Sequence, residues 1–202
     1  LMCSSPANFF HALRRHLKRP FRKPLVVFTP KSLLRHSACI SKLEDFSEKN
    51  FQEIIDDKIE NKENITKLLL CSGKIYYDLI EERERLGKQD TAIVRLEQLY
   101  PFPKSILNII LENYLSVSEY SWVQEEPVNM GAWNYVSQWL KVIGFMVVAR
   151  PISSSPATGS YEMHKLRHRK LLDKAFGECV CERSNMECKM VCLHSENNIE
   201  LL

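Results

Sequence analysis

The feature that most constrains the fold is a series of short, uninterrupted apolar runs, each followed by a segment with helical periodicity. Runs of this kind, without polar alternation, are typical of strands that are buried on both faces, as in a parallel sheet. The runs lie at 25–28, 68–71, 92–94, 120–123 and 145–149. The sequence therefore predicts an α/β fold: three layers, α/β/α, with a mostly parallel sheet of about five strands.

The segments between these runs carry helix signals. Ser5 and Pro6 provide a hydroxyl cap and a first-turn proline, and Phe9, Phe10, Leu13 and Leu17 then fall on one helical face. Helices are expected over 6–19, 32–36, 74–86, 103–114, 131–142 and 161–176. The acidic stretch 40–64 is interpreted as a surface excursion with one short strand at 51–55.

Two finer predictions concern the helix expected over 74–86. Its core stripe is expected to use the apolar side chains Ile75, Tyr76, Leu79 and Ile80. On its solvent side, Glu81 and Arg85 have the spacing of a favourable i,i+4 ion pair.

Composition and charge limit the classes of function. The chain has 202 residues, which is enough for one domain with a core, and its net charge of +3 does not by itself argue for nucleic acid. The basic stretch 14–23 lacks the interleaved aromatic residues that stack bases, so a solvated helix end or an inter-domain contact is favoured. No apolar run reaches the length of a membrane span, and single cysteines scattered through the main body favour a reducing compartment.

The carboxyl ends of the predicted strands are where a ligand is expected in an open α/β sheet. Lys31 and Lys74 each follow such a strand end beside a hydroxyl residue, at the start of a predicted helix, and Arg95 follows the third strand. Helix N-termini and a guanidinium favour an anion, so Lys31, Lys74 and Arg95 are candidates for a phosphate or carboxylate site. On spacing alone, helix caps with solvated lysines are the simpler interpretation.

No catalytic residue and no metal ligand is assigned. Glu125 and Glu126 follow the fourth predicted strand. If that strand continues through them, they point to opposite faces, which makes them a poor acid–base pair and favours a surface role. His164 and His168 have a metal-compatible spacing, but basic neighbours surround them and the glutamate of a zincin motif is missing. The serines at 153–155 lack a nucleophile-elbow motif.

Longer strings in the chain resemble a known family. LVVFTPKSLLRH (25–36), LCSGKIYYDL (70–79), AIVRLEQLYPFP (92–103) and WVQEEP (122–127) occur in the order found in the thiamine-dependent first component of 2-oxoglutarate dehydrogenase. Gly131, Ala132, Trp133, Arg150-Pro151 and SPATG (155–159) continue the match. The resemblance covers roughly 5–177, and several long motifs in order are more specific than any one of them. Met130 stands where the family usually has glutamine.

The resemblance implies the C-terminal domain of a transketolase-like enzyme, with residues 5–177 as the domain. The full enzyme decarboxylates 2-oxoglutarate on thiamine diphosphate with magnesium and passes the succinyl group to the lipoyl arm of the dihydrolipoyl succinyltransferase component. In the family the cofactor-binding segments lie upstream, so this chain is expected to hold no cofactor and to be inactive alone. The domain is expected to support a homodimer and a regulatory acetyl-CoA or AMP site, in the bacterial cytoplasm or, as the weaker alternative, the mitochondrial matrix.

The remaining segment, 178–202, does not resemble the family and is expected to be a disordered tail. Its four cysteines form a loose pattern, and an unstructured tail is favoured over a zinc site. Three hypotheses stay open: a part of the dehydrogenase that acts with its missing domains, a stand-alone anion- or nucleotide-binding regulatory module without catalysis, and a nucleic-acid binder that uses residues 14–23.

Overall fold

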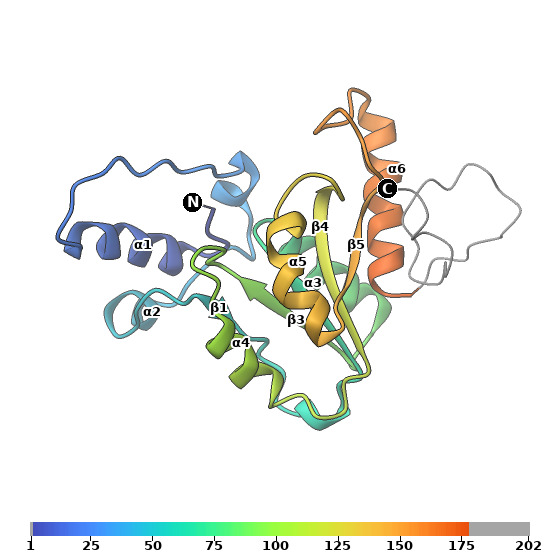
Figure 1. The fold of residues 1–202 in the computed structure, drawn as a ribbon, viewed down its shortest axis with the longest axis horizontal. Coiled ribbons are helices and arrows are strands. Elements are labelled where there is room, and N and C mark those ends of the chain that lie inside the picture. The colour runs from blue at the N-terminus through green and yellow to red at the C-terminus, as the bar shows by residue number, and fades with distance from the viewer. Residues whose placement is uncertain (1, 178–202) are drawn as a thin grey trace, which may run out of the picture.

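The computed structural model describes residues 2–177, which form a three-layer α/β/α structure around one sheet (Figure 1). The sheet has five strands in the order β1-β3-β2-β4-β5. All neighbouring strands run parallel except β1, which pairs with β3 in the antiparallel sense. The strands are β1 (Ile54–Ile55), β2 (Lys67–Cys71), β3 (Thr91–Leu96), β4 (Glu119–Pro127) and β5 (Met146–Arg150). The predicted fold class is therefore confirmed.

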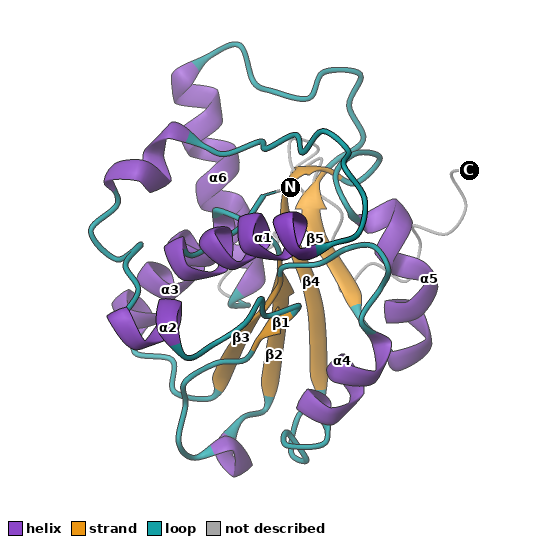
Figure 2. Ribbon diagram, turned by 90° about the vertical axis from the view of Figure 1, so that its left-hand side faces the viewer, coloured by secondary structure: helices purple, strands orange, loops and turns teal. Residues whose placement is uncertain are grey.

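Helices cover both faces of the sheet, as Figure 2 shows, and shorter elements lie before β2. The α-helices are α1 (Pro6–Lys18), α2 (Leu43–Ser47), α3 (Ile75–Leu86), α4 (Lys104–Leu111), α5 (Trp133–Ile143) and α6 (Tyr161–Ala175), with two 3-10 helices, η1 (Lys31–Arg35) and η2 (Lys62–Asn64). Among the described residues, no helix combines the length and the apolar character needed to cross a bilayer.

The alternation of side chains along the strands divides the core into two layers. Leu68 and Leu70 point to the face covered by α4 and α5, whereas Leu69 and Cys71 point to the face covered by α3 and α6. All four side chains are fully buried. Because successive strand residues face opposite sides, a central strand with helices on both faces must be apolar at every position. This explains why β2 appears in the sequence as an unbroken apolar run.

The predicted strand at 25–28 is wrong. These residues form an extended loop, and the side chain of Phe28 is 72% exposed. The edge of β3 that a further strand would need is already used, because Ile54 and Ile55 pair with it and the Asp57 carboxylate accepts a hydrogen bond from the Ile93 amide at 2.7 Å. The fifth strand is instead β1, within the short strand expected at 51–55.

Helix α1 packs through its polar side rather than through the apolar face seen in the sequence. Asn8 Nδ2 donates to Glu97 Oε2 at 2.9 Å and to the Gln52 carbonyl at 3.0 Å, and His11 Nε2 lies 2.8 Å from the Asp45 carbonyl. These contacts direct the opposite side of the helix outward. The apolar face of α1, formed by Phe9, Phe10, Leu13 and Leu17, is therefore 37–70% exposed.

The ion pair expected between Glu81 and Arg85 is also wrong. Arg85 binds Glu82 instead, with Nε at 2.9 Å from Oε2, and Arg169 of α6 contacts both oxygens of the same carboxylate at 2.8 Å. Glu82 is buried because α6 covers its position on α3, and a buried carboxylate requires such partners. The predicted core stripe is confirmed: Ile75 and Leu79 are buried in the core layer, and Tyr76 and Ile80 are partly buried and pack against it. Tyr77, which was not predicted in the stripe, is buried as well.

Gln124 fixes the turn that follows β4. Its Oε1 accepts hydrogen bonds from Trp122 Nε1 at 2.9 Å and from the Trp133 amide at 3.0 Å. Its Nε2 donates to the carbonyls of Pro127 at 3.1 Å and Met130 at 2.8 Å. Met130 thus contributes through its backbone, whichever side chain stands there. The buried amide of Gln124 therefore holds the start of α5 against the end of β4.

Glu82 should make stability depend on pH. Hydrogen bonds from Arg85 and then Arg169 lower the pKa of Glu82 from its ordinary value of 4.5 to about 2. A lowered folded-state pKa stabilises the protein above 4.5, and this contribution is lost as the pH falls towards 2. We expect Glu82→Gln to lower the melting temperature at pH 7, with the difference from wild type shrinking as the pH falls through this window. Glu84→Gln, on the exposed side of α3, is the control. A difference in melting temperature between wild type and Glu82→Gln that stays the same from pH 7 to pH 2 would contradict this role of Glu82.

Gln124→Ala should destabilise the protein by about 1–3 kcal/mol, because it leaves the buried Trp122 indole N–H without its acceptor. Urea unfolding followed by circular dichroism measures the loss. Gln138→Ala on the exposed side of α5 removes only a local bond to the Tyr135 carbonyl, so we expect it to cost less than about 0.5 kcal/mol. Equal losses in the two variants would mean that Gln124 does not hold the turn.

Candidate functional site

The direction of the chain reverses at the centre of the sheet, between β2 and β4. From β2 the chain passes through α3 to β3 on one side, whereas from β4 it passes through α5 to β5 on the other side. The two connections therefore leave the carboxyl ends of adjacent parallel strands in opposite directions. In open α/β sheets, ligands bind in the crevice that such a switch point creates.

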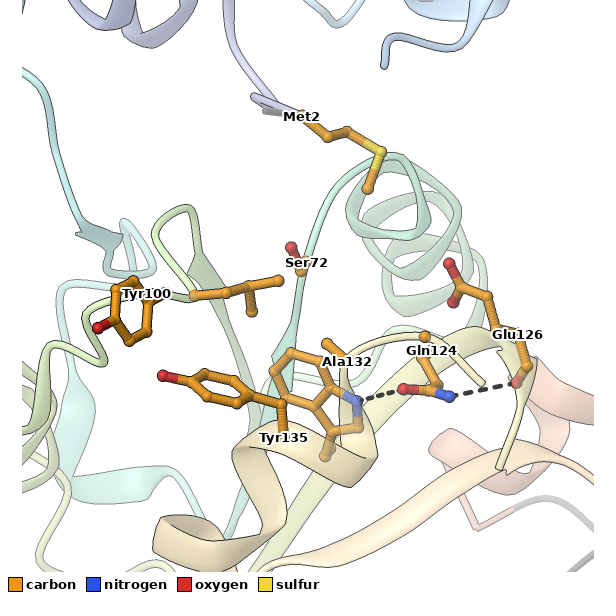
Figure 3. A pocket seen from close by; sticks show the side chains of 10 residues that line it. Met2, Ser72, Tyr100, Gln124, Glu126, Ala132 and Tyr135 are labelled. Carbon is orange, nitrogen blue, oxygen red and sulfur yellow. Dashed lines mark hydrogen bonds between the residues drawn. The ribbon is translucent and has the colours of Figure 1, made fainter. Parts of the chain in front are cut away.

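A cavity of about 430 Å³ lies at this switch point (Figure 3). Ser72 follows β2, Gln124 and Glu126 belong to β4, and Tyr100 and Tyr135 come from the loop after β3 and from α5. The remaining walls are formed by Met2, Leu99, Trp122, Gly131 and Ala132. Its volume falls in the range of small-molecule sites, and most of its lining is apolar or aromatic.

Gly131 shapes the rim of this cavity. Its φ of +67° is a conformation that side chains rarely adopt, and a Cβ at this position would lie 3.0 Å from Gln124 Nε2 and 3.1 Å from Glu126 Cβ. Glycine is therefore required for the turn to approach β4 so closely.

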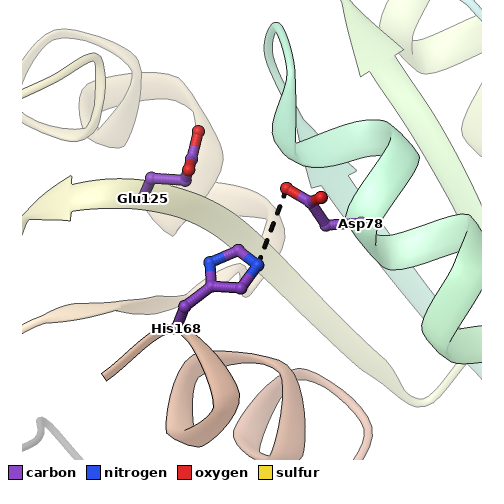
Figure 4. Close-up of side chains that lie close together, drawn as sticks. All are labelled: Asp78, Glu125 and His168. Atoms are coloured by element: carbon purple, nitrogen blue, oxygen red, sulfur yellow. Dashed lines mark ion pairs between the residues drawn. The ribbon is translucent and has the colours of Figure 1, made fainter. Parts of the chain in front are cut away.

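Lys74 lies on the other side of the same sheet edge, at the start of α3, in an ion cluster with Asp78 and Glu125. Figure 4 shows Asp78 and Glu125 with His168 beside them. Its Nζ is 2.9 Å from Glu125 Oε1 and 3.1 Å from Asp78 Oδ2. Burial lowers the pKa of Lys74, but the charges of Glu125 and Asp78 outweigh it and raise the pKa above the ordinary value. Glu125 and Glu126 thus face different groups, as expected for neighbours in a strand.

The structure brings His168 to this cluster but leaves His164 outside it. His168 Nε2 is 3.7 Å from Asp78 Oδ2, and one ligand atom each of Asp78, Glu125 and His168 lie within 4.8 Å of one another. A metal could use such a set, but the Lys74 ammonium already contacts both carboxylates. Because a divalent cation would have to displace that ammonium, the cluster is best described as an ion pair network.

Arg95 is buried in a polar cluster that anchors the N-terminal segment. Its Nη1 donates to Ser4 Oγ at 3.0 Å, and its guanidinium lies 3.9 Å from the centre of the Tyr76 ring. Ser4 also hydrogen-bonds to the Glu97 carboxylate, and its carbonyl accepts a bond from the Tyr77 hydroxyl at 2.5 Å. The Nε of Arg95 is buried without a hydrogen-bond partner in the part of the chain described here.

Lys31 differs from the other two anion candidates because it is exposed at the start of η1. The following His36 ring lies 4.8 Å from the ring of Tyr77, which places this segment beside α3. Lys74 and Arg95 each have a partner that an anion would need to displace or share, and only Lys31 is exposed to solvent. The anion site therefore remains a prediction for all three residues.

Sequence reasoning missed the cavity and the N-terminal anchor. Tyr100 belongs to the loop after β3, whereas Glu126 and Tyr135 belong to β4 and α5, and only the sheet order brings Tyr100 to the other two. Ser4 and Glu97 are 93 residues apart, and nothing in their spacing indicates that they pair. The one indication of the cavity in the sequence was the position of Glu126 after a predicted strand end.

Arg15, in the basic stretch 14–23, makes a hydrogen bond within the domain: its Nη1 donates to Gln98 Oε1 at 2.8 Å.

The comparisons with known proteins agree on one family. Residues 40–176 match the model of the 2-oxoglutarate dehydrogenase C-terminal family. The 2-oxoglutarate dehydrogenase E1 component of Rickettsia typhi is 43% identical over 187 residues, which cover 88% of this chain and 20% of that protein. The E1 component of Cupriavidus necator is 42% identical, over 87% of this chain and 19% of that protein.

Two further similar proteins are an enzyme and a solved structure. The multifunctional 2-oxoglutarate metabolism enzyme of Mycolicibacterium vanbaalenii is 40% identical, over 87% of this chain and 15% of that protein. A split-gene transketolase, solved as an inactive tetramer, is similar with a TM-score of 0.46 and 15% identity, over 64% of this chain and 43% of that chain. This chain spans about a fifth of the length of the E1 components that it matches. It belongs to the 2-oxoglutarate dehydrogenase C-terminal family.

Proposed function

We propose that the chain is the C-terminal supporting domain of a thiamine-dependent 2-oxoglutarate dehydrogenase and that it acts together with segments that carry the reaction centre. In that assembly the enzyme decarboxylates 2-oxoglutarate and transfers the succinyl group to the lipoyl arm of its succinyltransferase partner. The E1 relatives are bacterial, which supports a bacterial cytoplasmic setting. A homodimer is part of the same proposal.

The observation that carries this proposal is the exposed apolar face of α1. Phe9, Phe10, Leu13 and Leu17 lie together on one side of a helix, and the apolar loop 25–28 follows it. Figure 1 shows α1 and this loop on the side of the molecule opposite α6. Large contiguous apolar surfaces on a folded domain are typical of interaction sites. Since the relatives are about five times longer, further segments of such an enzyme are the natural partner of this surface.

The described residues do not fit thiamine diphosphate and magnesium. Asp78 and Glu125 are neutralised by Lys74, and the charged side chain that lines the cavity, Glu126, would repel a diphosphate. No catalytic step is therefore assigned to these residues. The contribution that this part of the chain makes is structural: it presents the α1 face and holds the carboxyl edge of the sheet in place.

A regulatory role is the second part of the proposal. Lys31, Lys74 and Arg95 are the candidates for contact with the phosphates of acetyl-CoA or AMP. The buried, unpartnered Nε of Arg95 and the exposure of Lys31 support it. The alternative, a stand-alone binding module without catalysis, would use the same three residues.

The first test measures thiamine-dependent decarboxylation of 2-oxoglutarate by the 202-residue chain, alone and mixed with the upstream segment of a close relative. We expect no activity from the chain alone and activity in the mixture. Leu17→Ser in the apolar face of α1 should lower the activity of the mixture, because it places a polar group in the contact. The control is Leu115→Ser at an exposed position away from α1. Activity of the isolated chain would refute the proposal.

The second test is calorimetric titration of the folded chain with acetyl-CoA and with AMP. Binding should weaken about three- to tenfold in Lys31→Ala, because one charge-assisted contact is lost. Lys58→Ala, at another exposed lysine, should bind like wild type. If folded protein shows no heat of binding with either acetyl-CoA or AMP, the regulatory role is ruled out, and the proposed supporting role is not affected.

A further inference from the structure

The cavity at the switch point carries a charge that the proposed anion site does not explain. Among the residues that line it, Glu126 is the one with a charged side chain, and none is a lysine, arginine or histidine. An anionic ligand would therefore be repelled by Glu126, and no cationic side chain in the lining would offset this repulsion. The cavity is a different site from the one sought with Lys31, Lys74 and Arg95.

The Glu126 carboxylate has hydrogen-bonding capacity to spare. No residue between 2 and 177 donates a hydrogen bond to it, and the nearby amide of Gln124 is occupied by backbone carbonyls. Arg150 interacts with Glu126 only through its charge, since its Nε, Nη1 and Nη2 donate to neutral oxygens of Glu125, Thr158 and Pro156. A cationic donor entering the cavity would supply the partner that Glu126 lacks.

The other end of the cavity is aromatic. The ring centres of Tyr100 and Tyr135 lie 6.3 Å apart, and Tyr100 is 80% exposed at the rim. Figure 3 shows these two rings gathered at one end and Glu126 at the other, with Ser72 and Ala132 between them. Leu99 and Trp122 extend the apolar walls. A ligand that fills this space is aromatic or apolar along its body and positively charged at one tip.

We propose that this cavity binds a small amphipathic organic cation, an amine with an aromatic or apolar body, whose ammonium pairs with Glu126 while its body packs against Tyr100 and Tyr135. The volume of about 430 Å³ suits a small molecule, and the lining combines apolar walls with a few polar groups, as ligand sites do. Aromatic rings at the rim also attract a cation as it enters. This site does not depend on the proposed enzymatic role.

The test uses three probes with the same body and different heads: 4-phenylbutylamine, 4-phenylbutanol and 4-phenylbutyrate. Each is titrated into the ¹⁵N-labelled 202-residue chain and followed by NMR. The indole N–H of Trp122 reports on the cavity directly, because it is bonded to Gln124 in the cavity wall. We expect the amine to shift this signal and to bind about tenfold more tightly than the alcohol, with the carboxylate weakest.

Substitutions test separately how the charge of Glu126 and the aromatic ring of Tyr100 contribute to binding. Glu126→Gln should abolish the advantage of the amine over the alcohol, whereas Glu119→Gln, at the opposite end of β4, should leave it intact. Tyr100→Ala should weaken all three probes by about threefold, and Tyr161→Ala, an exposed tyrosine on α6, should not. Tyr100 and Tyr161 are both largely exposed, so neither change is expected to unfold the domain.

Three results would overturn the proposal. One is equal binding of the amine and the alcohol, and another is an amine preference that survives Glu126→Gln. The third is the absence of any shift at the Trp122 indole up to the solubility limit of the amine, in a chain whose spectrum shows that it is folded.

Discussion

The structure depends first on the parallel pairing of β2 with a neighbour on each side. β2 matches β3 and β4 over the same five residues, Lys67–Cys71, so both faces and both edges of the strand are covered. A strand in this position must be apolar at every residue. Its side chains point alternately into the core layer covered by α3 and α6 and into the layer covered by α4 and α5. The position of β2 also creates the reversal at the carboxyl edge, since the chain leaves β2 and β4 in opposite directions. The cavity and the Lys74 cluster both lie at that edge.

The N-terminal segment is the second element that shapes this edge. Ser4 is completely buried between Arg95, Glu97 and Tyr77, and Met2 reaches over Gly73 to line the cavity. The same anchoring determines how α1 sits. With Asn8 and His11 turned inward to make hydrogen bonds, the phenylalanines and leucines of α1 are left outside. The buried hydrogen bonds of Asn8 and His11 therefore leave the apolar face of α1 on the surface of the domain.

Much of the fold could be predicted from the sequence, because the strands at 68–71, 92–94, 120–123 and 145–149 are local patterns with local causes. The errors share a different origin. The run 25–28 is as apolar as β2, but a strand also needs a free edge, and β1 and Asp57 occupy the edge of β3. Glu82 was missed because its burial depends on α6, which lies 87 residues away at Arg169.

The candidate site was predictable only in part. Lys74 was predicted as an anion candidate because it follows a strand end, whereas Glu126 was considered only as one half of a poor acid–base pair with Glu125. The surroundings of both depend on partners from other elements. The ammonium of Lys74 is satisfied by Glu125 and Asp78, and Glu126 lines the same cavity as tyrosines from two separate segments. The four cysteines of the C-terminal segment, with the predicted disordered tail at 178–202, lie outside the described residues.

The central claim is that these residues form a supporting α/β domain whose reaction centre is contributed by other segments. The most direct measurement is equilibrium titration of the folded 202-residue chain with thiamine diphosphate in the presence of Mg²⁺. The account predicts that no saturable binding is detected, because the carboxylates at the sheet edge are engaged by Lys74 and the cavity is lined by an acidic side chain. Binding of one thiamine diphosphate per chain would contradict it.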